Sequence, residues 1–199
     1  RLGCPADFGE CTAIAVSPDR SATGGTLLAQ NWDWLGAQRE ALVLLRIRET
    51  NGSACLTLTE AGMLAKIGLN DRGFGVCLNI LRSEDDGARP DVPVHVLLRA
   101  LLQRASVQDA IQFASRIRAG ASSNVLCADT SGDAASLELA PARMHVVRDP
   151  GGALCHTNHF LAPGAQPSEV ALPPSLSSRP RLECARRHAA SRAKLGIAE

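Results

Sequence analysis

The sequence predicts a single α+β domain in which helices cover β-sheets. Runs rich in β-forming residues occupy most of 11–80 and return over 124–156. Between them, over 93–118, the apolar residues switch to the 3- and 4-residue spacing of helices. This order, with a final helix, is typical of a layered domain. At 199 residues, the chain is long enough to bury a substantial core.

Several short apolar runs, each bounded by turn residues, indicate strands. Glycines at the tight turns 70–73 and 129–132 can adopt the positive φ that hairpins need. The expected strands, in order, are 11–16, 26–33, 41–47, 55–59, 66–69, 75–80, 124–128, 135–139, 144–147 and 153–156.

Helix signals dominate the middle of the chain and its end. Pro93 suits a first helical turn, and Ser106 followed by Asp109 resembles a capping box. Two helices are expected from about 93 to 118, the second ending at Gly120, and a third over about 180–194. The proline-rich residues 162–180 are expected to form a loop.

Composition narrows the function classes. The net charge of +1 and the six aromatic residues, none of them Tyr, disfavour a nucleic-acid or membrane partner, and no apolar run is long enough to cross a bilayer. Seven cysteines without a C-x-x-C pair argue against a zinc ribbon or a full disulfide framework. Cys55, Cys77 and Cys127 are expected to be buried hydrophobes. No secretory signal is visible at Arg1, which slightly favours the cytoplasm but leaves the compartment unassigned.

Five motifs stand out along the chain. They are Asp7-Phe-Gly-Glu-Cys-Thr-Ala-Ile-Ala-Val16, Gln30-Asn-Trp-Asp-Trp34, the block from Thr59 to Asn79, His156-Thr-Asn-His159 and the helix start at 178–183. These motifs resemble those of the isopenicillin-N acyltransferase family of N-terminal-nucleophile (Ntn) hydrolases, and their order and spacing agree over nearly the whole chain. Members of this family cut their own precursor just before a Cys-Thr pair.

The resemblance implies a four-layer αββα sandwich. Residues 1–10 would be the end of a propeptide or small subunit, and 11–199 the Ntn-hydrolase domain. The family's C-terminal strands, with an arginine that they contribute to the site, would lie beyond Glu199, so we expect the domain to be incomplete at that end.

The resemblance also implies the reacting residues. Cleavage between Glu10 and Cys11 would make Cys11 the nucleophile, although Glu10 departs from the glycine that the penicillin-forming enzyme carries there. An N-terminal cysteine has its own base, because an α-amino group with a pKa near 7.7–8.0 can accept the thiol proton. Asp33 would pair with this amine or orient the proton path, and Asn158 would donate to the oxyanion.

Other residues are candidates for support or for different chemistry. Thr12 could position the attacked carbonyl, Asn31 could support the strand end, and His156 is a third supporting candidate. A Cys–His dyad with His156 or His159 would give a thiol hydrolase instead. Cys155-His156-x-x-His159 carries metal-ligand types, but two histidines three residues apart on a strand face opposite sides, so we expect no metal.

The resulting expectation is a self-processing amide-bond enzyme that forms a thioester on Cys11 and passes the acyl group to water or an amine. The expected partners are a small amide or acyl-CoA substrate and the chain's own propeptide, and no cofactor is expected. An alternative from another class is a truncated, non-catalytic relative that acts as a binding module. The reactivity of the cysteine thiols distinguishes the enzyme from the binding module. In a binding module, the thiol of Cys11 should not react faster than the thiol of Cys4.

Overall fold

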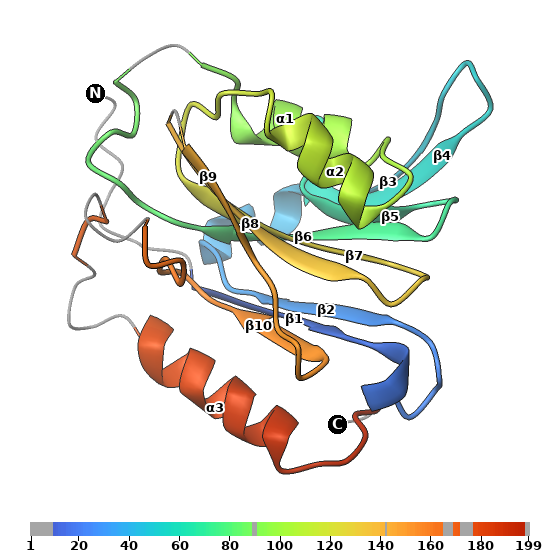
Figure 1. The fold of residues 1–199 in the computed structure, drawn as a ribbon. Coiled ribbons are helices and arrows are strands. Elements are labelled where there is room, and N and C mark those ends of the chain that lie inside the picture. Colours follow the sequence, from blue (N-terminus) through green and yellow to red (C-terminus); the bar gives the residue numbers. More distant parts are fainter. Residues whose placement is uncertain (1–9, 89–90, 142, 165–168, 172–176, 198–199) are drawn as a thin grey trace.

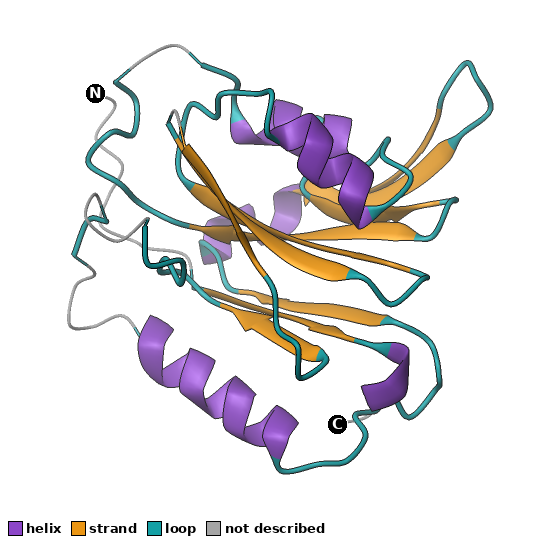
Figure 2. Ribbon diagram, viewed as in Figure 1, coloured by secondary structure: helices purple, strands orange, loops and turns teal. Residues whose placement is uncertain are grey.

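The structure is a computed structural model with four layers. Helix α3 covers a three-stranded sheet, this sheet packs on a seven-stranded sheet, and helices α1 and α2 cover the outer face of the larger sheet (Figures 1 and 2). This is the αββα order that the resemblance implies. The structure describes residues 10–88, 91–141, 143–164, 169–171 and 177–197.

The strands and helices follow the predicted order, and the strand bounds agree to within about one residue. Two short 3₁₀ helices, at Pro18–Arg20 and Gly36–Ala41, lie in stretches where we predicted no helix. The other elements are β1 Cys11–Val16, β2 Leu27–Trp32, β3 Leu42–Arg48, β4 Ala54–Glu60, β5 Ile67–Asn70, β6 Phe74–Ile80, α1 Val94–Leu101, α2 Val107–Ala114, β7 Ser123–Asp129, β8 Ala134–Ala140, β9 Arg143–Val147, β10 Ala153–His156 and α3 Ser178–Ala190.

Strand β1 lies in the middle of the small sheet, whose order is β10-β1-β2, and both pairings are antiparallel. The core between the two sheets is built mainly from small side chains. It includes Ala13 and Ala15 of β1, Cys77 of β6 and Ala128 of β7. Small residues let two sheets approach closely, and this packing holds β1 against the centre of the larger sheet.

The second core lies between the large sheet, of order β3-β4-β5-β6-β7-β8-β9, and helices α1 and α2. Leu97, Leu98 and Leu101 recur at helical spacing on α1 and are almost fully buried, together with Phe74 of β6. Burying a leucine side chain contributes about 2 kcal/mol, so this larger-residue core anchors the helices. The expected burial of Cys55, Cys77 and Cys127 is confirmed.

Helix α2 begins as predicted but ends earlier. The Ser106 hydroxyl accepts the backbone N–H of Asp109 at 3.1 Å, which is the predicted N-cap. The helix ends at Ala114, and the prediction that Gly120 stops it was wrong. The chain leaves the helix because 118–120 pair with Val92 instead. Val92 N–H donates to the Arg118 carbonyl at 3.0 Å, and Gly120 N–H donates to the Val92 carbonyl at 2.8 Å.

Helix α3 also ends before its predicted limit of 194, at Ala190. The cause is Arg20, whose guanidinium donates to the carbonyls of Ala189 at 2.6 Å, Arg192 at 2.9 Å and Ala193 at 3.1 Å. A cation at a helix C-terminus satisfies carbonyls that have no partner within the helix. Within the described residues, no helix is long and apolar enough to cross a membrane.

Candidate active site

Cys11 opens β1 at the end of the sheets that lies on the left of Figure 1. It pairs with Trp32 on β2, and it is 4% exposed. Side chains alternate along a strand, so Cys11 lies on the same face of β1 as Ala13, which is buried against the larger sheet. The thiol therefore lies in the layer between the sheets.

The peptide bond that joins Glu10 to Cys11 is held on both sides. Its carbonyl, from Glu10, accepts the backbone N–H of Asp33 at 2.9 Å. Its N–H, from Cys11, donates to Asn158 Oδ1 at 2.7 Å. The next carbonyl, that of Cys11, accepts Arg181 Nη1 at 2.5 Å. Both polar groups of the Glu10–Cys11 bond therefore have a partner, and with Arg181 on the next carbonyl the three partners come from three different segments.

Asn158 follows β10 and is buried. Its backbone N–H donates to Ser178 Oγ at 2.9 Å, and its Nδ2 donates to the Ile80 carbonyl at 3.0 Å. Its Oδ1 accepts from Cys11 N–H and from Arg181 Nη2, the latter at 3.0 Å. The side chain thus contacts the predicted cleavage site through its oxygen. The oxyanion role of its NH₂ group stays a prediction.

Arg181, which the sequence did not single out as a site residue, enters the site from the first turn of α3. Its guanidinium contacts Thr12 Oγ1 at 2.8 Å as well as the Cys11 carbonyl and Asn158. Thr12, predicted as a supporting residue, is therefore held by this arginine. No helical pattern distinguishes Arg181 from its basic neighbours, and the resemblance at 178–183 was the only available signal.

Asn31 lies near the end of β2, and Asp33 directly follows the last residue of this strand. The backbone N–H of Asp33 reaches the site, while the residue as a whole is exposed. Asn31 is exposed and lies opposite Thr12 in the register of β1 and β2. The predicted role of the Asp33 carboxylate and the support from Asn31 stay predictions. What the structure adds is a backbone donor on the Glu10 carbonyl.

The histidines of the late strand motif face other partners. His156 is fully buried, with Nε2 2.8 Å from Glu138 Oε1 and Nδ1 2.8 Å from the Thr157 carbonyl. His159 Nδ1 lies 2.7 Å from Ser178 Oγ, and burial lowers the pKa of His159 to about 4. Both ring nitrogens of His156 are thus occupied, so its geometry favours a structural role over a dyad with Cys11.

The environment of the Cys11 thiol keeps it protonated. Burial raises the pKa of Cys11 above its ordinary value, although the Asp33 amide, the Gln30 side chain and the charges of Lys66 and Arg181 act in the opposite direction. A neutral thiol is a weak nucleophile, so reaction requires a base that removes its proton.

A buried ion pair, which sequence reasoning did not single out, lies beside the site. Lys66 Nζ is 2.8 Å from Glu60 Oε1, and each side chain is 6% exposed. The ammonium also lies 4.0 Å from the centre of the Trp32 ring and 4.9 Å from that of Trp34. Cation–π contact with two rings compensates part of the desolvation of the lysine. Since Trp32 pairs with Cys11, this cluster forms one wall of the site.

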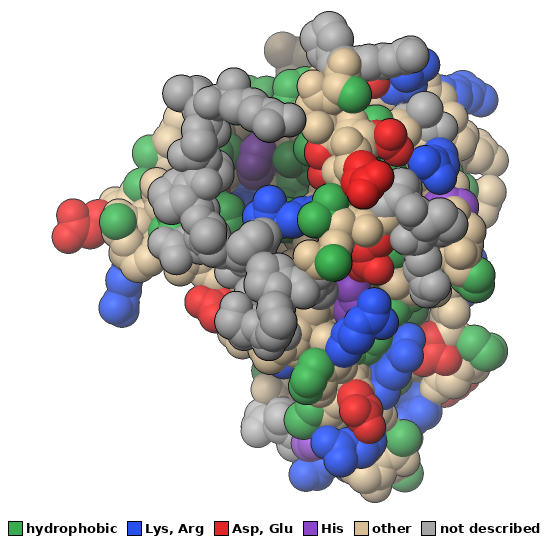
Figure 3. All heavy atoms as spheres, turned by 90° about the vertical axis from the view of Figure 1, so that its left-hand side faces the viewer, with side chains coloured by type: hydrophobic (Ala, Val, Ile, Leu, Met, Phe, Trp, Pro, Cys, Tyr) green, Lys and Arg blue, Asp and Glu red, His purple; other side chains and the backbone are tan. Residues whose placement is uncertain are grey.

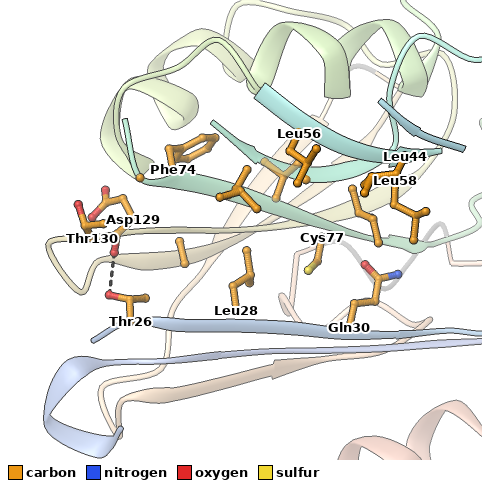
Figure 4. A pocket seen from close by; sticks show the side chains of 17 residues that line it. Thr26, Leu28, Gln30, Leu44, Leu56, Leu58, Phe74, Cys77, Asp129 and Thr130 are labelled. Atoms are coloured by element: carbon orange, nitrogen blue, oxygen red, sulfur yellow. Dashed lines mark hydrogen bonds between the residues drawn. The ribbon is translucent and has the colours of Figure 1, made fainter. Parts of the chain in front are cut away.

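The molecule is hollowed on the side where β1 begins, and a basic side chain is visible at the bottom of this hollow (Figure 3). A separate, mostly apolar pocket of about 460 Å³ lies between β2 and the large sheet (Figure 4). Gln30 and Cys77 line its end, and Gln30 joins the sheets by accepting Leu78 N–H at 2.9 Å and donating to the Leu78 carbonyl at 2.7 Å. The Gln30 side chain also hydrogen-bonds the Cys11 thiol, so the pocket adjoins the thiol through this residue.

The sequence matches a known family over most of its length. Residues 20–191 match the family described as acyl-coenzyme A:6-aminopenicillanic acid acyl-transferase, and Cys11 precedes the matched residues. The 40 kDa form of acyl-coenzyme A:6-aminopenicillanic-acid-acyltransferase from Emericella nidulans is 34% identical over 164 residues. That alignment covers 80% of this chain and 45% of the relative, so the chain spans less than half of the relative's length.

Solved structures agree with the fold. Penicillin G acylase from Alcaligenes faecalis gives a TM-score of 0.67 at 11% identity, over 94% of this chain and 50% of that one. A mutant of conjugated bile acid hydrolase from Clostridium perfringens gives 0.55 at 14% identity, over 85% of this chain and 66% of that one. The chain thus belongs to the acyl-coenzyme A:6-aminopenicillanic acid acyltransferase family and has the Ntn-hydrolase fold.

Proposed function

We propose that this chain carries a self-processing acyltransferase or amidohydrolase site whose nucleophile is Cys11. The observation that carries the proposal is the peptide bond before Cys11, with the Asp33 amide on its carbonyl and Asn158 on its N–H. A donor on the carbonyl oxygen stabilises the negative charge that develops there when a nucleophile attacks. Family membership supports the acyl-transfer class.

In the proposed cleavage, Cys11 Sγ attacks the carbonyl carbon of Glu10 as its proton is removed. The carbon–nitrogen bond between the two residues breaks, the nitrogen of Cys11 takes up a proton, and a thioester remains. Water then hydrolyses the thioester, which releases Glu10 as a carboxylate and regenerates the thiol. Cys11 is left with a free α-amino group, hydrogen-bonded in this geometry to Asn158 Oδ1.

In the mature site, the α-amino group would accept the thiol proton, and the thiolate would attack the carbonyl of an amide or of an acyl-CoA. The resulting thioester would transfer its acyl group to an amine or to water. The name of the Emericella nidulans relative motivates acyl-CoA as the donor class. We propose no metal or organic cofactor for these steps.

The test compares intact mass and N-terminal sequence for the purified protein and two variants, Cys11→Ala and Cys155→Ala. Cys155 is a buried cysteine of the neighbouring strand, and its thiol donates to the carbonyl of Ala153 within that strand, so it is the matched control. We expect the parent and Cys155→Ala to begin at Cys11 and Cys11→Ala to remain whole. A folded parent that stays uncut, or cleavage that survives in Cys11→Ala, would refute self-processing by Cys11.

A further inference from the structure

The side chain of Glu10 has no part in the reaction described above, yet it is held by three donors. Glu10 Oε1 accepts the backbone N–H of Ser177 at 2.7 Å, and Oε2 accepts the Ser177 hydroxyl at 2.6 Å. Arg181 Nε lies 3.1 Å from Oε2. The side chains of Glu10 and Arg181 are 20% and 23% exposed, so this ion pair is largely shielded from water. We call Ser177 and Arg181 the Glu10 cradle.

The cradle is anchored to the rest of the site. Ser177 precedes the first residue of α3, and its hydroxyl also accepts Arg181 Nε at 3.0 Å. Arg181 in turn contacts the Cys11 carbonyl and Asn158. The carboxylate of Glu10 is therefore tied to the same arginine that holds the residue after the scissile bond.

The backbone of Glu10 is fixed at its other end by β2, where its carbonyl accepts the Asp33 amide. One residue thus bridges two elements, with its carbonyl on the small sheet and its carboxylate on α3. Fixing a residue's backbone in one conformation costs free energy, because conformational entropy is lost. A charged side chain with three donors can supply that energy, whereas a glycine at this position offers no such anchor.

We propose that Glu10 is a positioning residue for self-cleavage: its carboxylate, bound in the Glu10 cradle, holds the scissile carbonyl on the Asp33 amide and in line for attack by Cys11. This inference rests on the proposed function. It assigns a purpose to the departure from glycine at this position, because the anchored side chain orients the acyl half of the bond. Attack needs the reacting atoms about 3–3.5 Å apart and aligned, so loss of the anchor slows the step.

The charge state suits this role. Burial alone would raise the pKa of Glu10, but the hydrogen bonds from Ser177 and the charge of Arg181 outweigh it and lower the pKa. The carboxylate is therefore ionised at neutral pH and remains so in mildly acidic solution. Protonation would remove the negative charge that Arg181 pairs with and one of the acceptor sites.

The test measures the rate of self-cleavage of the full chain made by cell-free synthesis, followed by intact mass over time. We expect Glu10→Ala to slow cleavage about 10- to 100-fold. Glu10→Gln should slow cleavage less than Glu10→Ala, because the glutamine side chain keeps the shape of glutamate and one acceptor oxygen. Glu10→Asp should be as slow as Glu10→Ala, since a side chain one methylene shorter does not reach the cradle. Glu183→Gln, an exposed charge change on α3, is the matched control and should cleave at the parent rate.

Two further variants separate positioning from general stability. Ser177→Ala removes one donor of the cradle and should slow cleavage severalfold, while Glu10→Ala combined with Ser177→Ala should be no slower than Glu10→Ala alone. In a Cys11→Ala background, which stays uncut, the Glu10 variants should unfold at the parent temperature to within a few degrees.

Parent-like or faster cleavage in Glu10→Ala or Glu10→Gly would overturn the inference, as would independent, multiplying effects of the Glu10 and Ser177 changes. Neither result would affect the proposed function, which requires only that Cys11→Ala abolishes cleavage. Cleavage that continues without Cys11 would instead refute the proposed function itself. The two failures are therefore distinguishable in one set of measurements.

Discussion

Replacing Glu138 by alanine should destabilise this protein strongly, because the carboxylate organises the segment that carries Asn158. Glu138 lies on β8 and is fully buried. Its Oε1 is 2.8 Å from His156 Nε2 and accepts Leu161 N–H at 2.6 Å, and its Oε2 accepts Ala162 N–H at 3.0 Å. These three donors lie on both sides of Asn158 in the chain, so one side chain fixes both ends of that segment.

The expected magnitude follows from these bonds. Removing one partner of a buried, hydrogen-bonded pair costs about 3–5 kcal/mol, because the groups left behind lose their partners without regaining water. Glu138→Ala should therefore lower the free energy of unfolding by about 3–5 kcal/mol. Glu138→Gln keeps the Oε1 acceptor but turns an NH₂ group toward a donor. This change should lower the free energy of unfolding by about 1–3 kcal/mol.

Urea unfolding in a Cys11→Ala background measures these losses without a mixture of cut and uncut chains. Asp133→Ala is the control, since it removes an exposed ion pair with Arg148 and should cost less than about 1 kcal/mol. A loss for Glu138→Ala that is no larger than for this control would refute the reasoning, because it would mean that water or a rearranged neighbour satisfies the three donors.

The Glu138 carboxylate also makes the stability of the fold depend on pH, and the sign of this dependence follows from the direction of its pKa shift. Burial alone would raise the pKa of Glu138, but His156 and the backbone N–H groups of Leu161 and Ala162 lower it below its ordinary value near 4.5. A group whose pKa is lower in the folded state stabilises the fold above its unfolded pKa. That contribution is lost as the pH falls through the folded value. The stability gap between parent and Glu138→Gln should therefore be full at pH 7 and shrink below about 4.5.

Three further perturbations test other parts of the structure. Lys66→Met should lower the free energy of unfolding in urea by about 3–5 kcal/mol, because it leaves the buried Glu60 carboxylate unpaired. Adding Glu60→Gln should recover most of this loss. A double variant that recovers no stability would contradict the ion-pair account. Ser106→Ala should cost about 1 kcal/mol, measured by thermal unfolding, because it removes the cap on Asp109 N–H; an unchanged melting temperature would contradict this. The rate of self-cleavage should rise about tenfold per pH unit and should still be rising above pH 9, since the thiolate is the nucleophile and burial raises the pKa of Cys11. A rate that reaches a plateau below pH 8 would contradict a buried thiol nucleophile.

Periodicity predicted the strands and helix starts well because those features are local. The strand over 11–16 and the cap at Ser106 depend on residues within one turn or one strand of each other. Helix ends were less predictable, because distant groups decide them. Arg20 donates hydrogen bonds to carbonyls at the end of α3, about 170 residues away in the chain. Val92 forms backbone hydrogen bonds with residues 118–120, which therefore do not continue α2. No local pattern carries that information.

The candidate site divides in the same way. Cys11 and Asn158 were identified from the motif resemblance, and the structure brings them to within hydrogen-bonding distance. Arg181 and Lys66 were not singled out, because a lysine on a strand and an arginine on a basic helix are ordinarily solvated. Tertiary partners shield both side chains from water: Glu60 and two tryptophan rings surround the buried Lys66, and Glu10 with its neighbours surrounds the half-buried Arg181.

The hydrogen bond between Cys11 and Asn158 links the uncut and cut forms of the proposed enzyme. Before cleavage, the nitrogen of Cys11 is an amide, which cannot accept a proton, and the buried thiol beside it stays neutral. After cleavage, the same nitrogen would be an amine that can serve as a base, still next to an acceptor oxygen on Asn158. One bond scission would therefore create the base without moving the nucleophile. Departure of the cleaved segment that ends at Glu10 would then remove the carboxylate paired with Arg181 and leave the charge of this arginine available in the mature site.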